Sequence, residues 1–185
     1  PDFIPAFVMN YVLGGGSFSS RLMEEVREKR GLAYSIGTYL HPLDHAAMLF
    51  GQVGTKNERV GETLAIVRKE MARMAEEGIG EEELADAKTF LTGSYPLRFT
   101  SNKSIANQLL GFQLEDLGID YVERRNAMIE AVTQEDIARV AKRLLKPENM
   151  LVAIVGKPDL SPDSGLPEKD DMAPASPAHP GEMPN

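Results

Sequence analysis

The chain has 185 residues, a hydrophobic content of 42% and a formal net charge of −8, which suits one globular domain with a substantial core. It contains no cysteine, which excludes disulfides and thiolate metal sites, and its acidity argues against nucleic acid as a general partner. An apolar run of about 18 or more residues is absent, so the sequence predicts no membrane span.

The N-terminal part of the chain predicts two helices separated by glycines. Apolar residues recur at helical spacing from Phe3 to Leu13, and the glycines at 14–16 are expected to end that helix. Ser17 or Ser19 then caps a second helix, which stops at Gly31.

A β-hairpin is expected next. The pattern turns to period two, so that one face of a strand carries Tyr34, Ile36, Thr38 and Leu40. The segment HPLDH at 41–45 is typical of a turn, and residues 46–55 form the returning strand.

The rest of the domain is expected to be helical until a final strand. Asn57 is expected to cap a helix with an apolar stripe from Val60 to Met74, and a second helix is expected from Glu81 towards Tyr95, where Pro96 stops it. A third is expected from a cap near Ser101 to Gly118, and Asp120 is expected to cap a fourth. A fifth begins at a capping box formed by Thr133 and Asp136. The apolar run in ENMLVAIVG, residues 148–156, predicts a buried closing strand.

These elements predict an α+β domain over residues 1–157, with a mainly antiparallel sheet covered by helices on one face. Residues 158–185 are rich in proline and poor in large apolar side chains. Such a segment cannot offset its ordering entropy by burial, so it is predicted to be a disordered tail.

The glycine-rich segment LGGGSFSSRL has two competing interpretations. A glycine loop before a helix can cradle an anion, but this one lacks G-K-[ST], does not fit G-x-G-x-x-G and follows a helix rather than a strand. A nucleotide-binding module is therefore the least favoured function. A hinge, or a loop that admits a peptide backbone closely, is favoured.

The histidines give a weak metal signal. His41, Asp44 and His45 resemble the inverted zinc motif His-x-x-Glu-His, but that motif needs a helix to place its imidazoles one turn apart. Pro42 and the flanking strand patterns favour a hairpin turn with solvated histidines. His179 lies in the predicted tail and is assigned no role, so no metal ligands are expected in this chain.

Arg27 and Tyr34 lie seven positions apart, on either side of the helix stop at Gly31. By spacing alone, the favoured interpretation is a solvated last-turn cation and an ordinary strand aromatic. The charged runs EEVREKR and AEEGIGEEEL are likewise most simply solvated faces.

Three segments together change that interpretation. VLGGGSFSSRLMEEVREKRGLAYSIGTYL, GIGEEELADAKTFLTGSYPLRF and AVTQEDIARVAKRLLKPENMLVAIVG resemble the pitrilysin, insulinase and mitochondrial processing peptidase family, and in particular its second, non-zinc domain. The resemblance covers nearly all of the chain from Asp2 to Gly156. The opening strand usual for such a domain is expected to be missing before Pro1, which would expose a sheet edge and allow a homodimer of the fragment.

The resemblance implies that two similar α+β domains or subunits enclose a cavity, and that the partner supplies the zinc. It assigns Arg27 and Tyr34 to the substrate side: a hydroxide held on the partner's zinc attacks a peptide carbonyl, Tyr34 stabilises the oxyanion, and Arg27 holds neighbouring carbonyls. Gly14, Gly15, Gly16 and Ser17 would contact an extended substrate. The family's zinc ligands are not matched here, so the chain alone is expected to be inactive.

The leading hypothesis is therefore the substrate-binding half of a zinc metallopeptidase, completed by a zinc-bearing homologous domain or subunit. The alternative is a non-catalytic structural or assembly protein of the same family. No residue fixes the compartment; a periplasmic setting suits a bacterial member, and a cytoplasmic one stays open.

Overall fold

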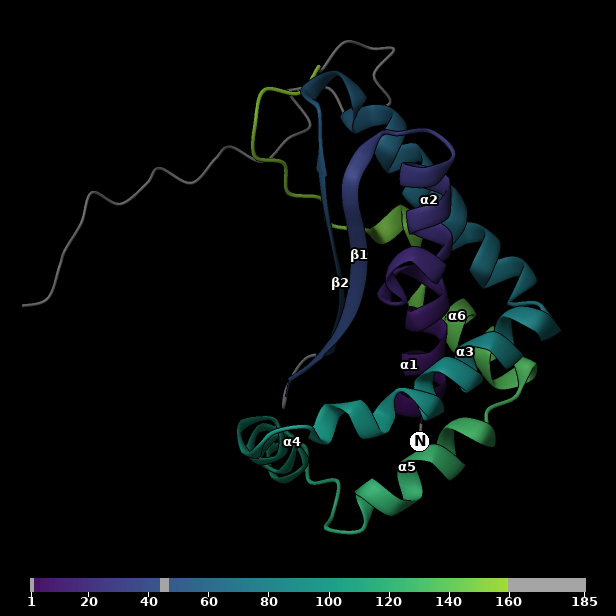
Figure 1. Ribbon diagram of the computed structural model, residues 1–185. Helices are drawn as coiled ribbons and strands as arrows, with labels where there is room; N and C mark the ends of the chain where they lie inside the picture. The colour runs from purple at the N-terminus through teal and green to yellow at the C-terminus, as the bar shows by residue number, and fades with distance from the viewer. Residues whose placement is uncertain (1, 44–46, 160–185) are drawn as a thin grey trace, which may run out of the picture.

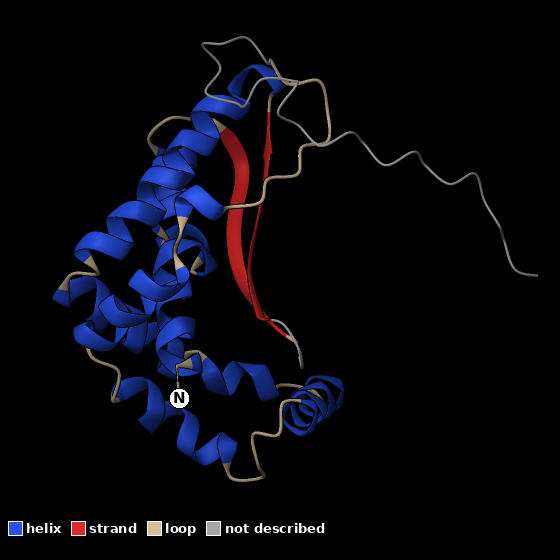
Figure 2. Cartoon of the chain, turned by 180° about the vertical axis from the view of Figure 1, so that it is seen from behind, coloured by secondary structure: helices blue, strands red, loops and turns tan. Residues whose placement is uncertain are grey.

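The helices of this protein lie on one side of a two-stranded antiparallel sheet (Figure 1). The computed structural model describes residues 2–43 and 47–159. Seen from behind, the sheet again stands to one side of the helices, and α4 and α5 gather at one end (Figure 2). The predicted α+β architecture is confirmed, with two strands in the described part of the sheet.

Helical segments precede and follow one hairpin in the described part of the chain. Four α-helices and the hairpin form the frame: α1 (Phe3–Asn10), β1 (Ala33–Pro42), β2 (Ala47–Thr55), α2 (Val60–Glu77), α3 (Glu81–Gly93) and α6 (Gln134–Leu144). At the end of the molecule lie α4 (Asn102–Leu114) and α5 (Tyr121–Glu130). Short π or 3-10 segments connect them: η1 (Tyr11–Gly15), η2 (Ser17–Ser19), η3 (Met23–Glu28), η4 (Asn57–Arg59), η5 (Tyr95–Phe99) and η6 (Pro147–Asn149).

The hydrophobic core lies where α1 contacts α6 and β1. Val8 and Met9 of α1 are fully buried, as are Val26 of η3 and Ile137 and Val140 of α6. Each such side chain contributes roughly 1.5–3 kcal/mol when it leaves water. Because η3 and β1 both join this core, the two elements that carry Arg27 and Tyr34 are fixed relative to each other.

A buried ion pair ties the start of the second helix to α3. Arg21 donates to both carboxylate oxygens of Glu83 at 2.7 Å and to the Gly78 carbonyl at 3.0 Å. Hydrogen bonding from Arg21 lowers the pKa of Glu83, so the carboxylate stays ionised. This bidentate contact holds η3 against the helical layer.

The first helix ends within the glycines at 14–16, as predicted. Beyond α1 it continues as the π-helical segment η1 through Gly15. A Cβ on Gly14 would lie 2.5 Å from Thr38 Oγ1 and 3.0 Å from the Thr38 backbone nitrogen. Glycine is needed there because η1 packs directly on β1, and not because the chain must turn.

Two of the predicted helix caps are present with their side-chain hydrogen bonds. Ser101 with Ser104 and Thr133 with Asp136 form reciprocal capping boxes. Ser17 and Ser19 instead lie in η2, where the Ser17 carbonyl accepts a hydrogen bond from Ser20 Oγ.

The cap expected at Asn57 is wrong, because Arg59 is at the N-cap position of α2; Asp120 is at the N-cap position of α5, as expected, but makes no side-chain cap hydrogen bond. Asn57 Oδ1 accepts a hydrogen bond from the backbone nitrogen of Lys157, and Asp120 pairs with Arg124 at 2.7 Å. Both side chains are used for contacts that sequence spacing does not reveal.

The predicted buried closing strand is absent. Residues 150–156 have no strand structure, and Leu151 and Val155 are exposed, Leu151 to 96%. Among the described residues the sheet contains β1 and β2, and neither pairs with this segment. An apolar run forms a buried strand only where a neighbouring edge can satisfy its backbone groups.

Some predictions fall outside the described residues. Asp44, His45, His179 and the predicted tail from residue 160 onward belong to this group. Within 2–43 and 47–159, no helix has the length and apolar character that a membrane crossing requires.

Candidate functional site

The helix that carries Arg27 ends at Gly31, and β1, which carries Tyr34, begins two residues later. Gly31 has a φ of +60°, and its backbone nitrogen donates to the Arg27 carbonyl at 2.8 Å. Leu32 N donates to the Val26 carbonyl at 2.9 Å. The stop predicted at Gly31 is confirmed, and its left-handed conformation lets the chain leave the helix directly into β1.

A β-bulge at the start of β1 sets the direction of the Tyr34 side chain. Ala33 pairs with Thr55 and Ser35 pairs with Gly54, so Tyr34 is the extra residue. Ala33 and Ile36 are both buried although they are three positions apart, whereas Tyr34 is 85% exposed. The predicted shared face of Tyr34 and Ile36 is therefore wrong, because the bulge turns the phenol outward.

The Arg27 guanidinium lies close to two aromatic rings. Its Cζ atom is 5.3 Å from the centroid of the Tyr34 ring and 4.6 Å from that of the Phe18 ring. Both distances are within the range of cation–π attraction. Phe18 belongs to η2 and is 64% exposed, so burial in the core does not explain why an aromatic residue is found there. Phe18 was not among the residues predicted from the sequence, although an aromatic residue within a glycine–serine segment was an available signal.

An ion-pair network fixes the end of the helix that carries Arg27. Glu25 accepts from Lys29 Nζ at 2.6 Å and from Arg30, whose guanidinium also donates to the Glu25 carbonyl. These hydrogen bonds lower the pKa of Glu25 to about 2. Arg27 itself has one ion pair in the described part of the chain, a long one of 3.6 Å from its Nε to Glu28. Its remaining N–H groups are available to a ligand.

The glycines expected to contact substrate lie next to this cluster. Gly14 is buried against Thr38, whereas Gly15 is exposed and Gly16 is partly exposed. Ser17 is exposed and has a φ of +52°, which presents Phe18 toward Arg27. Close packing against Thr38 explains why residue 14 is a glycine. A role of residues 15–17 in binding a peptide stays a prediction.

Zinc has no ligand set in the described part of the chain. Residues 2–43 and 47–159 contain no group of three or more His, Asp or Glu side chains that could hold a metal ion. His41 is an exposed residue of β1, paired with Met48 across the hairpin. The donor atoms of the described residues therefore do not fit a resident zinc.

The sequence and the fold of this chain are similar to those of known proteins. The sequence profile described as "Peptidase M16 inactive domain" matches residues 1–91. A crystal structure of a peptidase M16 inactive domain from Pseudomonas fluorescens superposes with a TM-score of 0.70 at 32% identity, covering 80% of this chain and 35% of that one. This chain belongs to the peptidase M16 family. The resemblance to the family's second, non-zinc domain is thereby confirmed.

Curated M16 relatives carry different names. An uncharacterized zinc protease of Streptomyces coelicolor is 35% identical over 141 residues, which are 75% of this chain and 30% of that protein. The "Non-peptidase homolog YmxG" of Helicobacter pylori is 32% identical over 154 residues, 83% of this chain and 35% of that protein. The chain thus spans about a third of these M16 relatives, and their names include both a protease and a non-peptidase.

Proposed function

We propose that this chain is the substrate-binding and transition-state-assisting half of a zinc metalloendopeptidase, which cleaves peptides in a cavity closed by a zinc-binding partner domain or subunit. The observation that carries the proposal is the exposed Tyr34 phenol stacked on the Arg27 guanidinium. An exposed, ordered pair of donors on a protein surface suits recognition of peptide carbonyls.

Tyr34 is assigned to the scissile carbonyl. When that carbonyl is attacked, negative charge develops on its oxygen, and a phenolic O–H aimed at the oxygen stabilises the charge. Loss of one such donor typically costs about 10²–10³ in rate. The bulge at Tyr34 supports this role, because it leaves the phenol exposed and away from the core, where a substrate can reach it.

Arg27 is assigned to the neighbouring carbonyls of the substrate. Its guanidinium has several N–H groups in a fixed planar fork. The rings of Phe18 and Tyr34 restrict that fork, since its Cζ lies 4.6 and 5.3 Å from their centroids. Pre-arranged donors lose less entropy when a peptide binds, so the stack favours positioning of the substrate.

The metal in this proposal belongs to the partner. The described residues offer no ligand cluster for zinc, so the isolated chain is expected to bind peptide without cleaving it. The pairing of an inactive domain with a catalytic one is inferred from the M16 family profile and from solved inactive domains such as that of P. fluorescens.

The competing function is a non-catalytic assembly protein. The name of the H. pylori relative, a non-peptidase homolog, is the observation in its favour. In that case the Arg27–Tyr34 stack would serve contact with another protein, and hydrolysis would not depend on the phenol.

The test is to assemble the chain with a partner that carries a His-x-x-Glu-His motif and to measure cleavage of a basic, unstructured peptide. Tyr34→Phe should lower kcat by about 10²–10³. Tyr39→Phe is the matched control, because Tyr39 is on the same strand and its ring contacts that of Phe50, 5.0 Å between centroids. Full activity of Tyr34→Phe would remove Tyr34 from the reaction, and an inactive wild-type assembly would favour the assembly protein.

A further inference from the structure

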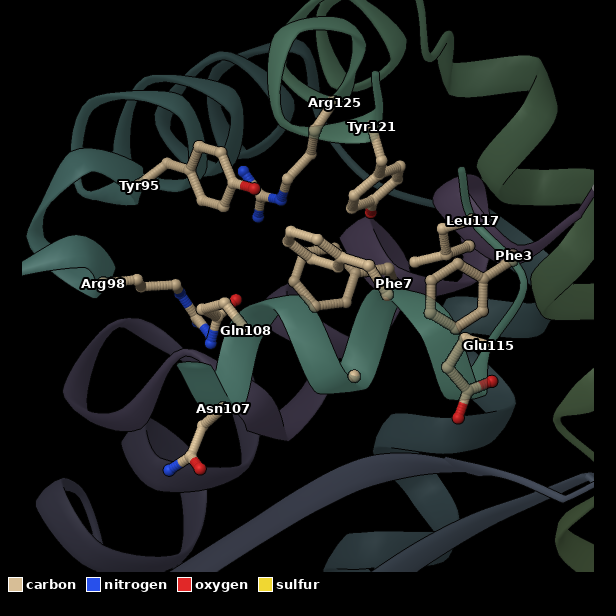
Figure 3. Close-up of a pocket in the computed structure, with 12 residues that line it drawn as sticks. Phe3, Phe7, Tyr95, Arg98, Asn107, Gln108, Glu115, Leu117, Tyr121 and Arg125 are labelled. Atoms are coloured by element: carbon tan, nitrogen blue, oxygen red, sulfur yellow. The ribbon is translucent and has the colours of Figure 1, made fainter. Parts of the chain in front are cut away.

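A second feature of the molecule is a cavity at the end formed by α1, η5, α4 and α5 (Figure 3). Its volume is about 220 Å³. None of the residues that line it belongs to the Arg27–Tyr34 site. Its walls combine aromatic rings with two guanidinium groups, Arg98 and Arg125, and one carboxylate, Glu115.

Arg125 is a buried cation without a counter-ion. It is 5% exposed, and no carboxylate among the described residues pairs with it. One of its terminal nitrogens donates to the Leu91 carbonyl at 3.1 Å and to Asn126 Oδ1 at 3.2 Å. A buried charge is costly unless an opposite charge or hydrogen bonds compensate it, and here the compensation comes from hydrogen bonds, including one with the Tyr121 side chain, and not from a carboxylate. Burial correspondingly lowers the pKa of Arg125.

The Tyr95 hydroxyl is a buried donor without a partner in the described part of the chain. Tyr95 itself is 5% exposed. The Arg125 Cζ lies 4.1 Å from the Tyr95 ring centroid, so the phenol and the guanidinium are side by side, as Figure 3 shows. Burial raises the pKa of Tyr95, so its O–H proton is retained and available to an acceptor. Unpaired buried donors are rare in native proteins and point to a missing partner.

Aromatic rings form the remaining wall. The Phe3 and Phe7 rings stack at 6.4 Å, and the Phe112 and Tyr121 rings meet edge to face at 5.1 Å. Glu115 lies at the opposite end of the cavity from Arg98 (Figure 3). The cavity therefore has a cationic, donor-rich end and an apolar wall.

We propose that this cavity binds a carboxylate that is attached to a short apolar body. The carboxylate accepts hydrogen bonds from the guanidinium of Arg125 and the hydroxyl of Tyr95, and the apolar body packs on Phe7 and Phe112. Pockets for drug-sized ligands occupy about 300–1,000 Å³, so a cavity of about 220 Å³ suits a single residue or a small organic acid. The same chemistry is found in a free aryl carboxylate and in the C-terminal residue of a peptide.

The experiment is an NMR titration of the ¹⁵N-labelled chain with three probes. N-acetyl-Gly-Phe has a free carboxylate, N-acetyl-Gly-Phe-amide lacks the charge, and 3-phenylpropionate lacks the peptide. The acid should shift amide resonances of η5, α4 and α5, and the amide should bind at least about tenfold more weakly. Equal binding of acid and amide, or no binding of any probe, overturns the proposal.

The same titration identifies the source of the carboxylate. If 3-phenylpropionate binds as tightly as N-acetyl-Gly-Phe, the cavity takes free carboxylates. If N-acetyl-Gly-Phe binds about tenfold more tightly or better, peptide C-termini are the natural ligands. Both results support a carboxylate site.

Variants assign the binding groups. Tyr95→Phe removes a hydroxyl that has no partner, so it should leave the melting temperature unchanged and weaken binding of N-acetyl-Gly-Phe about tenfold. Arg125→Gln should abolish binding, whereas Arg124→Gln, an exposed neighbour on α5, removes the same charge and should not. If Arg125→Gln does not fold, Tyr95→Phe decides, and unchanged affinity in that variant overturns the proposal.

Discussion

The Arg27 guanidinium and the Tyr34 ring are stacked, with 5.3 Å from Cζ to the ring centroid, although one residue ends a helix and the other begins a strand. Two backbone features produce the stack. Gly31 ends the helix in a left-handed conformation, and the bulge turns Tyr34 outward. The Phe18 ring also contacts the guanidinium, with its centroid 4.6 Å from Cζ. The site is thus held by backbone conformation as much as by side-chain contact.

Phe18 should act as a positioning residue for Arg27. Replacing it by leucine keeps an apolar side chain of similar size but removes the ring face that attracts the guanidinium. Exposed cation–π contacts are worth about 0.5–1 kcal/mol, so Phe18→Leu in the assembled enzyme should raise KM roughly two- to fivefold with little change in kcat. Steady-state kinetics with a fluorogenic peptide measure both constants.

The conservative variant Phe18→Tyr provides the control, because it retains the aromatic face and should retain the wild-type KM. Phe18 is 64% exposed, so neither variant should shift the melting temperature. A lower kcat at unchanged KM in Phe18→Leu would contradict a positioning role.

The helix stop at Gly31 should be intolerant of a side chain. Gly31 has a φ of +60°, and a left-handed backbone costs most L-residues roughly 1–2 kcal/mol. Gly31→Ala should therefore lower the melting temperature by about 2–8 °C, by the usual scaling for a domain of this size. Thermal unfolding followed by circular dichroism measures the change.

Gly93→Ala is the matched control for Gly31→Ala. Gly93 ends α3 with ordinary helical backbone, and a Cβ there meets nothing within 4 Å. Alanine is the better helix former, so this variant should be neutral or slightly stabilising. A similar loss of stability in both variants would show that the conformation of Gly31 is not the cause.

Gly14 separates two explanations of the glycine-rich segment. A Cβ at this position would lie 3.0 Å from the backbone nitrogen of Thr38, so Gly14→Ala should push η1 away from β1 and cost about 1–3 kcal/mol. If Gly14 served substrate contact alone, the variant would keep its stability and lose affinity for peptide. Urea unfolding distinguishes the two, with Gly54→Ala as a control in open space.

Local signals in the sequence predicted much of the helical frame. Three local features that depend on neighbouring residues alone are present as predicted: the capping boxes at Ser101 and Thr133 and the helix stop at Gly31. The family resemblance predicted that Arg27 and Tyr34 belong to one site, and in the structure the guanidinium lies 5.3 Å from the Tyr34 ring centroid.

The failures came from contacts between distant segments. Periodicity places Tyr34 on the face of Ile36, but the bulge depends on pairing with Thr55 and Gly54. Likewise, the run at 148–156 has the composition of a strand but finds no partner edge in the described sheet. Phe18 was missed because its role depends on an arginine of the next helix.

Glu25 should stabilise the protein in a pH-dependent way. Its ordinary pKa is 4.5, and hydrogen bonds from Lys29 and Arg30 lower it to about 2 in the folded protein. A depressed carboxyl pKa gives stability that is full above the unfolded value and is lost as the pH falls through the folded value. The contribution should therefore be complete above about pH 5 and disappear as the pH falls from 4.5 to about 2.

Glu25→Gln tests this dependence. The partners are partly exposed, Lys29 to 52% and Arg30 to 37%, so solvent screening reduces the expected loss to about 1 kcal/mol at pH 7. The difference from wild type should shrink as urea unfolding is repeated at pH 4 and pH 3. Glu76→Gln, at an exposed carboxylate of α2 without an ion pair in the described residues, should show no such trend. A Glu25→Gln deficit that stays constant from pH 7 to pH 3 would mean that packing, and not the charge, stabilises this helix end beside Arg27.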